Sequence, residues 1–256
     1  MALWSGFILL TVAAAALPAA GQAPQPGPAS SATAPKLDVV VLDPAHGGSD
    51  SGARGPAGTI ESEVVLDFAR AIRVALEAQG FRAVLTREGN QGPTFDERSA
   101  LINGLSDAVF VSLHVASTGP PGTARVYYYS ALPSPSSPTL AQPGPGRPPL
   151  TTRPSGLIEW GRAQEHYVEL SRRLADLVQI QLAQQFRGSP EIPAAAAIRQ
   201  LRTVAAPAIA IEISSITSDP PQLARMGQPI GEALARAAGA FRLALASGTI
   251  EPGPAR

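Results

Sequence analysis

The chain has no cysteine among its 256 residues, and this absence removes several kinds of site at once. Disulfides, zinc sites with cysteine ligands and thiol nucleophiles are all excluded. The formal net charge is zero and no long basic run is present, so the electrostatic footprint of a nucleic-acid-binding protein is missing. Charged residues make up 16% and apolar residues 45%, a balance that favours a globular protein.

Beyond the N-terminus, the sequence also lacks any apolar run long enough to cross a membrane. Residues 1–20 are mostly apolar, and the small residues at 19–23 follow them, which predicts a secretory signal peptide over 1–22. An uncleaved anchor is the alternative, although the apolar run at 7–16 is shorter than the roughly 20 residues of a membrane span. We therefore expect export to the periplasm or cell envelope, with no membrane segment in the mature form.

Proline is abundant, with 26 residues, and its clusters divide the chain. Residues 23–36 are rich in Pro, Ala and Ser and predict a flexible linker. Residues 130–155 carry prolines without apolar periodicity and predict a loop or disordered insertion. With a polar tail at 248–256, one folded domain over 37–247 remains.

Between these segments, buried-strand patterns alternate with helical patterns. The predicted strands are 37–42, 81–86, 108–113, 125–129 and 207–213, and the predicted helices are 61–79, 94–105, 161–186 and 220–246. In the helix at 94–105, Phe95, Leu101 and Ile102 are expected to face inward. The alternation predicts an α/β protein, a single three-layer α/β/α domain whose mostly parallel or mixed central sheet is flanked by helices.

Polar side chains at the ends of these strands indicate a site. His46, His114 and Glu212 all lie at or near the carboxyl ends of predicted strands, where sites form in such sheets. A catalytic zinc takes three protein ligands, and two imidazoles with a carboxylate are one common set. Glu61 begins the first helix and is close enough in sequence to fold back beside His46. The predicted metal ligands are therefore His46, Glu61 and His114, with Glu63 as the rival carboxylate.

Glu212 is the candidate general base, because it is the one charged residue in an otherwise apolar strand. Burying a lone carboxylate costs free energy, so such a residue is kept for a metal, a partner or a reaction. A structural ion pair is the alternative role for Glu212. Arg98 and Arg202 are better explained as structural partners or rim charges, and the tyrosines at 127–129 as strand packing.

Four segments resemble the signatures of the zinc-dependent N-acetylmuramoyl-L-alanine amidases, in the right order and at the right distances. Leu85-Thr86-Arg87, followed by Arg98 and Asn103, is similar to the spacer pattern between the second and third signatures. The four segments are Val41-Leu42-Asp43-Pro44-Ala45-His46-Gly47-Gly48, Gly58-Thr59-Ile60-Glu61, Val111-Ser112-Leu113-His114 and Pro207-Ala208-Ile209-Ala210-Ile211-Glu212.

The resemblance implies an enzyme that hydrolyses the amide between N-acetylmuramic acid and L-alanine in peptidoglycan. It implies Zn²⁺ as the cofactor, held by His46, Glu61 and His114, with Glu212 as general base and acid. Two alternatives stay open. One is a catalytically weak peptidoglycan-binding or regulatory module of the same fold, and the other is a zinc peptidase that acts within the stem peptide.

Some positions depart from the family pattern. Ala45 stands where the family usually has Gly, and Ala116 where it has Asn; Ser214-Ser215 replace Gly-Phe, and Ser218 replaces Asn. These positions lie near the expected ligands and cleft, so they bear on substrate fit and rate. Several family members carry an autoinhibitory helix where this chain has the Pro-rich residues 130–155, which leaves an activator protein as an open partner.

Overall fold

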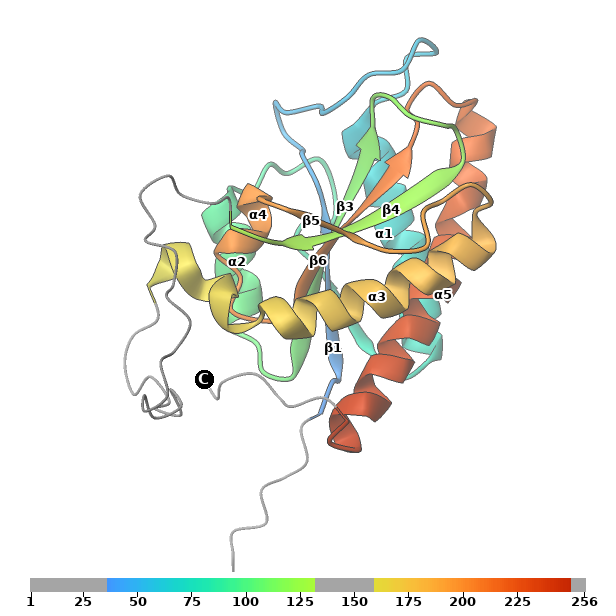
Figure 1. Ribbon diagram of the computed structural model, residues 1–256. Helices are drawn as coiled ribbons and strands as arrows, with labels where there is room; N and C mark the ends of the chain where they lie inside the picture. The colour runs from blue at the N-terminus through green and yellow to red at the C-terminus, as the bar shows by residue number, and fades with distance from the viewer. Residues whose placement is uncertain (1–35, 132–158, 250–256) are drawn as a thin grey trace, which may run out of the picture. The chain divides into compact units, whose positions relative to one another are not determined.

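Strand pairing builds one six-stranded sheet in the computed structural model, which describes residues 36–131 and 159–249. The strand order is β2-β1-β3-β6-β4-β5, and only β4 and β6 pair antiparallel (Figure 1). The expected α/β class with a mostly parallel, mixed sheet is confirmed. The strands are β1 (Val39–Pro44), β2 (Arg82–Leu85), β3 (Ala108–Ala116), β4 (Thr123–Tyr129), β5 (Ala194–Ala196) and β6 (Ala208–Ser214).

Helices cover both faces of the sheet, as a three-layer domain requires (Figure 1). On one face lie α1 (Glu61–Ala78), α3 (Val168–Gln185) and α5 (Pro220–Ala246); α5 packs against both α1 and α3, and α1 and α3 pack against the strands. On the other lie α2 (Phe95–Asn103), α4 (Arg199–Arg202) and the 3₁₀ helix η1 (Trp160–His166). No helix in the described ranges is long and apolar enough to span a membrane.

The helix expected over 161–186 is two elements. It begins as the 3₁₀ helix η1 and continues as α3 after Tyr167, whose φ of −118° interrupts the helical path. The buried Gln164 side chain anchors this 3₁₀ segment, because its Nε2 donates to the carbonyls of Val204 and Ala206 at 2.8 Å each. These bonds hold η1 against the loop that leads into β6.

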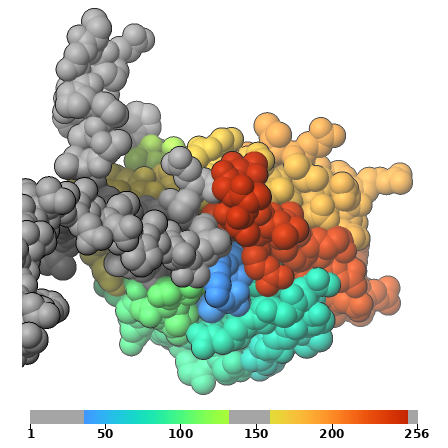
Figure 2. Space-filling view, turned by 90° about the horizontal axis from the view of Figure 1, so that it is seen from below, coloured from blue at the N-terminus to red at the C-terminus, as the bar shows by residue number. Residues whose placement is uncertain are grey.

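Alternation of side chains along the strands separates two hydrophobic cores. One face sends Val40, Val111 and Ile211 into the larger core beneath α1, α3 and α5. The other sends Val41 and Phe110 into a smaller core beneath α2 and α4. Figure 2 views the end where β1 begins (blue), beside the C-terminal part of α5 (red) and the segment around the end of α1 (teal). The polar residues lie at the opposite, carboxyl ends of the strands.

On the face of the smaller core, the same alternation brings polar side chains into two rows. Asp43 of β1 is in register with Ser112 of β3, and His114 of β3 with Glu212 of β6. Two of the four, His114 and Glu212, are predicted site residues, so strand register brings site chemistry together at one edge of the sheet. The predicted segments 1–22, 23–36, 130–155 and 248–256 lie almost wholly outside the described residues.

Candidate metal centre

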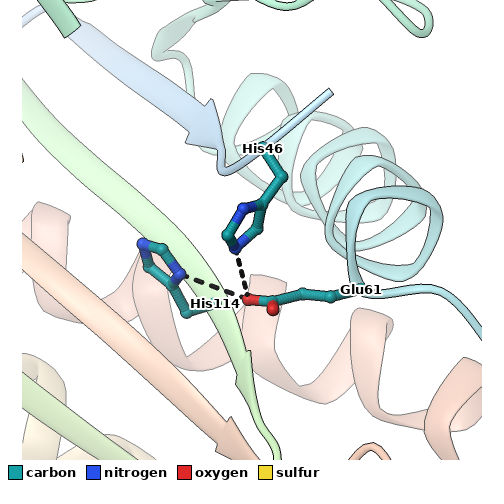
Figure 3. Close-up of side chains that lie close together, drawn as sticks. All are labelled: His46, Glu61 and His114. Carbon is teal, nitrogen blue, oxygen red and sulfur yellow. Dashed lines mark hydrogen bonds and ion pairs between the residues drawn. The ribbon is translucent and has the colours of Figure 1, made fainter. Parts of the chain in front are cut away.

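His46, Glu61 and His114 meet at one point, although they come from a loop, a helix and a strand (Figure 3). Oε1 of Glu61 lies 3.1 Å from Nε2 of His46 and 3.2 Å from Nδ1 of His114. The ligand atoms all lie within 4.8 Å of one another, and the two imidazole rings meet edge to face with centroids 5.4 Å apart. The fold therefore brings together the three side chains that the sequence analysis predicted as metal ligands.

The spacing and chemistry of these atoms fit a metal ion. Ligands about 2.0–2.2 Å from a tetrahedral ion lie roughly 3.3 Å from one another, close to the separations from Glu61 Oε1 to the two imidazole nitrogens. Two imidazoles and one carboxylate are a donor set found in catalytic metal sites. The arrangement can hold a divalent cation and leave one side of it accessible.

The turn after β1 sets the position of His46. His46 itself has a φ of 64° and Gly47 a φ of 115°, so the chain reverses within two residues. A Cβ on Gly47 would lie 2.1 Å from the carbonyl oxygen of Gln91. A Cβ on Gly52, whose φ is 65°, would lie 2.6 Å from both Glu61 Oε2 and His46 Cδ2. These two glycines are required because a side chain would push into the turn or the cluster.

Two buried arginines hold the same turn through hydrogen bonds to its backbone carbonyls. Arg98 donates from Nη1 to Asp43 Oδ1 at 2.5 Å and from Nη2 to the His46 carbonyl at 2.7 Å. Arg87 donates from Nη2 to the carbonyls of Ala45 and Ser62, at 2.8 and 2.7 Å. Arg98 is thus a structural partner, as expected, and Arg87 ties the His46 loop to the start of α1.

Both carboxylate oxygens of Glu61 accept hydrogen bonds, and the side chain is only 6% exposed. Oε2 accepts the Ala53 amide at 2.8 Å, and Oε1 accepts the Val115 amide at 2.9 Å. Burial alone would raise the pKa of Glu61, but hydrogen bonds from His114, His46 and these amides outweigh it and hold the pKa well below its usual range. Glu63, the rival carboxylate, is exposed and lies outside the cluster.

Asp50, which the sequence reading did not single out, orients His46. Its Oδ2 lies 2.8 Å from His46 Nδ1, so the ring presents Nε2 to Glu61. The hydrogen bond with Glu61, and after it the one with Asp50, raises the pKa of His46 to about 9 against the opposing effect of burial. The sequence offers only a weak signal for this role of Asp50, which is an acidic residue four positions after a histidine in a Gly-rich turn.

Glu212 lies half-buried on β6, directly opposite His114 in the strand register. Its Oε2 accepts a hydrogen bond from the Tyr127 hydroxyl at 2.9 Å. Burial first, and then this bond to Glu212, raise the pKa of Tyr127. Tyr127 therefore does more than the expected strand packing. Among the described residues, this hydroxyl, and no ion pair, holds the Glu212 carboxylate.

The serines that replace family residues after β6 are used inside their own turn. Ser218 donates its amide to the Ser215 carbonyl at 2.9 Å, and Ser215 Oγ lies 2.8 Å from Thr217 Oγ1. Ser215 and Ser218 are both buried. These bonds lie within the turn that follows β6 and involve no residue of the Glu61 cluster.

A cleft of about 590 Å³ begins at the cluster and runs along the carboxyl edge of the sheet. Its walls are the 45–50 loop, the N-terminal end of α2 and the first residues of α4. Phe95 lines this cleft and is 46% exposed, so the expectation that it faces the core was wrong. The reason is its place at the first turn of α2, since the helix buries Arg98, Ser99 and Ile102 further along.

Fold and site together define an α/β domain with a histidine–carboxylate metal-binding cluster at the carboxyl ends of its strands. The sequence profile of the N-acetylmuramoyl-L-alanine amidase family matches residues 40–231. The chain therefore belongs to this family.

Individual relatives agree with the family assignment. N-acetylmuramoyl-L-alanine amidase AmiC of Neisseria meningitidis is 40% identical over 91 residues, which are 36% of this chain and 21% of that protein. AmiA of Escherichia coli is 41% identical over 76 residues, 30% of this chain and 26% of that protein. The matches thus span only about a fifth to a quarter of these curated relatives.

Among solved structures, the amidase AmiC2 of Nostoc punctiforme superposes with a TM-score of 0.57 at 25% identity. The match covers 80% of this chain and 96% of that one. Ami1 of Mycobacterium smegmatis, at 22% identity and a TM-score of 0.55, shares the fold.

Proposed function

We propose that this chain is an exported, zinc-dependent amidase that hydrolyses the bond between N-acetylmuramic acid and L-alanine in peptidoglycan. The observation that carries the proposal is the His46–Glu61–His114 cluster with Glu212 on the adjacent strand. Family membership supports the choice of reaction. The apolar N-terminal residues support export, because peptidoglycan lies outside the cytoplasm.

Each side chain of the site has a separate task in this reaction. Nε2 of His46, a carboxylate oxygen of Glu61 and Nδ1 of His114 would hold the zinc, since these atoms face one another. When bound there, zinc supplies Lewis-acid chemistry, which polarises a carbonyl and makes water a better nucleophile near neutral pH. Asp50 keeps the His46 ring in the orientation that points Nε2 inward.

Glu212 moves the proton. In the hydrolysis, a C–O bond forms from water to the lactyl carbonyl carbon, and the C–N bond to L-alanine breaks. The Glu212 carboxylate takes the proton from the attacking water and gives it to the leaving alanine nitrogen. Because Tyr127 binds Oε2, the other oxygen of Glu212 is the one that carries the proton.

Zinc loading of the metal-free protein at pH 7.5 is expected to release about one proton from His46. The pKa of His46 in the metal-free protein is about 9, so this imidazole is protonated at that pH and must become neutral to coordinate. The apparent zinc affinity should therefore rise by up to about tenfold per pH unit below pH 9 on this account. Calorimetry in buffers of different ionisation enthalpy measures the released proton. Zinc binding with no proton release at pH 7.5 would contradict the assignment of His46.

Replacing Asp50 by Asn is expected to weaken zinc binding by about 10–100-fold above pH 9, where His46 is neutral in both proteins, because the carboxylate that orients His46 is lost. The variant should also release less than one proton at pH 7.5, since Asp50 contributes to the raised pKa of His46. Competition with a chromophoric chelator measures the affinity. Replacing the exposed Asp67, which pairs with Arg70 on α1, is the matched control and should change neither quantity.

The function itself is tested by incubating zinc-loaded protein with purified peptidoglycan and measuring released peptides. We expect release that stops with a chelator and returns with zinc. A folded, zinc-loaded protein that releases nothing would leave the peptidoglycan-binding module as the better account.

A further inference from the structure

The wall of the cleft contains a buried amide that makes no hydrogen bond within the described residues. Gln200 of α4 lines the cleft, and the residue is only 4% exposed. Within the described ranges neither Nε2 nor Oε1 of Gln200 has a hydrogen-bond partner. Buried side-chain amides nearly always find partners, because an unmade bond costs free energy. The neighbouring Leu201 is fully buried and fixes the position of Gln200 in the wall.

The preceding residue, Arg199, also lines the cleft and supplies a positive charge beside Gln200. The guanidinium carbon of Arg199 lies 5.0 Å from the centroid of the Phe95 ring. Stacking of this kind orients the guanidinium plane and leaves its N–H groups free to bind a planar anion. In the part of the chain that the structure describes, no carboxylate lies within 4.0 Å of Arg199.

The other charges of the cleft already have partners. Arg98 pairs with Asp43, and Asp50 pairs with His46. Asp96 accepts a hydrogen bond from Trp160 Nε1 at 3.2 Å. Arg199 is thus the cation of the described cleft that a ligand can use without breaking an existing ion pair.

We propose that Arg199 and Gln200 form a subsite for the peptide part of the substrate, in which Arg199 binds a carboxylate and Gln200 binds a peptide group. Both polar atoms of Gln200 are closed to solvent. A turn of the side chain toward the cleft would present its one acceptor and two donors, which can pair with both the N–H and the C=O of a peptide. A neutral acetylated sugar would satisfy Gln200 but leave Arg199 unused, whereas a stem peptide carries both groups. This proposal rests on the proposed function, because it takes the scissile bond to lie at the His46 end of the cleft.

Two substitutions test the subsite with a synthetic N-acetylmuramoyl-tripeptide as the probe. Gln200→Leu keeps the shape and removes both polar ends, and Arg199→Ala removes the cation. Each is expected to raise KM about tenfold with kcat within about twofold, the signature of binding lost equally from the ground and transition states. Arg202→Ala is the matched control, since Arg202 is an exposed arginine of the same short helix that does not line the cleft. Its KM should equal that of the unchanged protein.

A binding measurement separates this proposal from the proposed function. Calorimetry with the free stem tripeptide, and with the same peptide whose carboxylates are amidated, is run on the zinc-loaded protein and the variants. Amidation should weaken binding about tenfold in the unchanged protein and have no effect in Arg199→Ala. Thermal unfolding shows that each variant is folded, and Gln200→Leu should unfold at no lower temperature because it buries no unpaired amide.

The outcomes are distinct. Hydrolysis by the unchanged protein, with KM and peptide affinity equal in all variants, overturns the subsite and leaves the amidase proposal standing. Peptide binding that depends on Arg199 and Gln200, without hydrolysis, supports the subsite and counts against the amidase. Absence of both peptide binding and hydrolysis overturns both.

Discussion

Replacing Glu212 by Gln is expected to lower the rate of amide hydrolysis by about 10²–10⁴-fold while leaving the zinc content unchanged. An amide of the same shape cannot take a proton from water or return it to the leaving nitrogen. Glu212 is outside the ligand cluster, and the oxygen of the new side chain can still accept from Tyr127. Initial rates of peptide release, measured beside elemental analysis of bound zinc, give both quantities.

The controls for this substitution are the stability of the variant and its affinity for the peptide. The variant should unfold at the temperature of the unchanged protein and bind the stem tripeptide with the same affinity. A folded, zinc-loaded Glu212→Gln protein that keeps more than about a tenth of the rate would show that another group carries the proton.

Replacing Glu61 by Gln is expected to weaken zinc binding strongly and to abolish hydrolysis with it. Loss of a residue that only supports a ligand typically costs about 10–100-fold in metal affinity, and loss of a ligand should cost more. The substitution removes the one negative charge of the cluster and one of its ligand oxygens. Only one oxygen remains for the Ala53 and Val115 amides, so the metal-free protein should also lose about 1–3 kcal/mol of stability. Zinc retained after dialysis, and thermal unfolding without metal, are the measurements.

Glu63→Gln is the matched control for Glu61→Gln, because Glu63 lies on the same first turn of α1 and is exposed. It should keep both zinc and activity. The reverse result, with zinc lost from the Glu63 variant and kept by the Glu61 variant, would contradict the assignment of the ligands.

The sequence predicted the sheet well where strands are apolar runs buried on both faces. β1, β3 and β6 are such runs, and their predicted ends placed His114 and Glu212 near the carboxyl edge of the sheet. β5 could not be predicted, because Ala194–Ala196 has no strand preference of its own. It exists because its backbone pairs with β4, a tertiary contact that no local pattern records.

The sequence predicted the three candidate metal ligands of the site. His46, Glu61 and His114 carry scarce chemistry at strand and helix ends, so their meeting follows from topology. The residues that position the site were not predicted. Asp50 gives only a weak local signal beside His46, and Tyr127 reaches Glu212 across a strand pairing that the sequence does not record. The sequence gives no signal for Gln200, because only the structure shows that its side-chain amide is buried and has no hydrogen-bond partner among the described residues.

The central claim is tested most directly by the chemical identity of the products from peptidoglycan. The zinc-loaded chain without residues 1–22 is incubated with purified peptidoglycan, and released peptides are sequenced by mass spectrometry, with a chelator-treated sample beside it. Intact stem peptides that begin with L-alanine, absent after chelation, are the predicted result. Peptides that lack the first alanine, which stays on the glycan, would instead establish a peptidase and contradict the account.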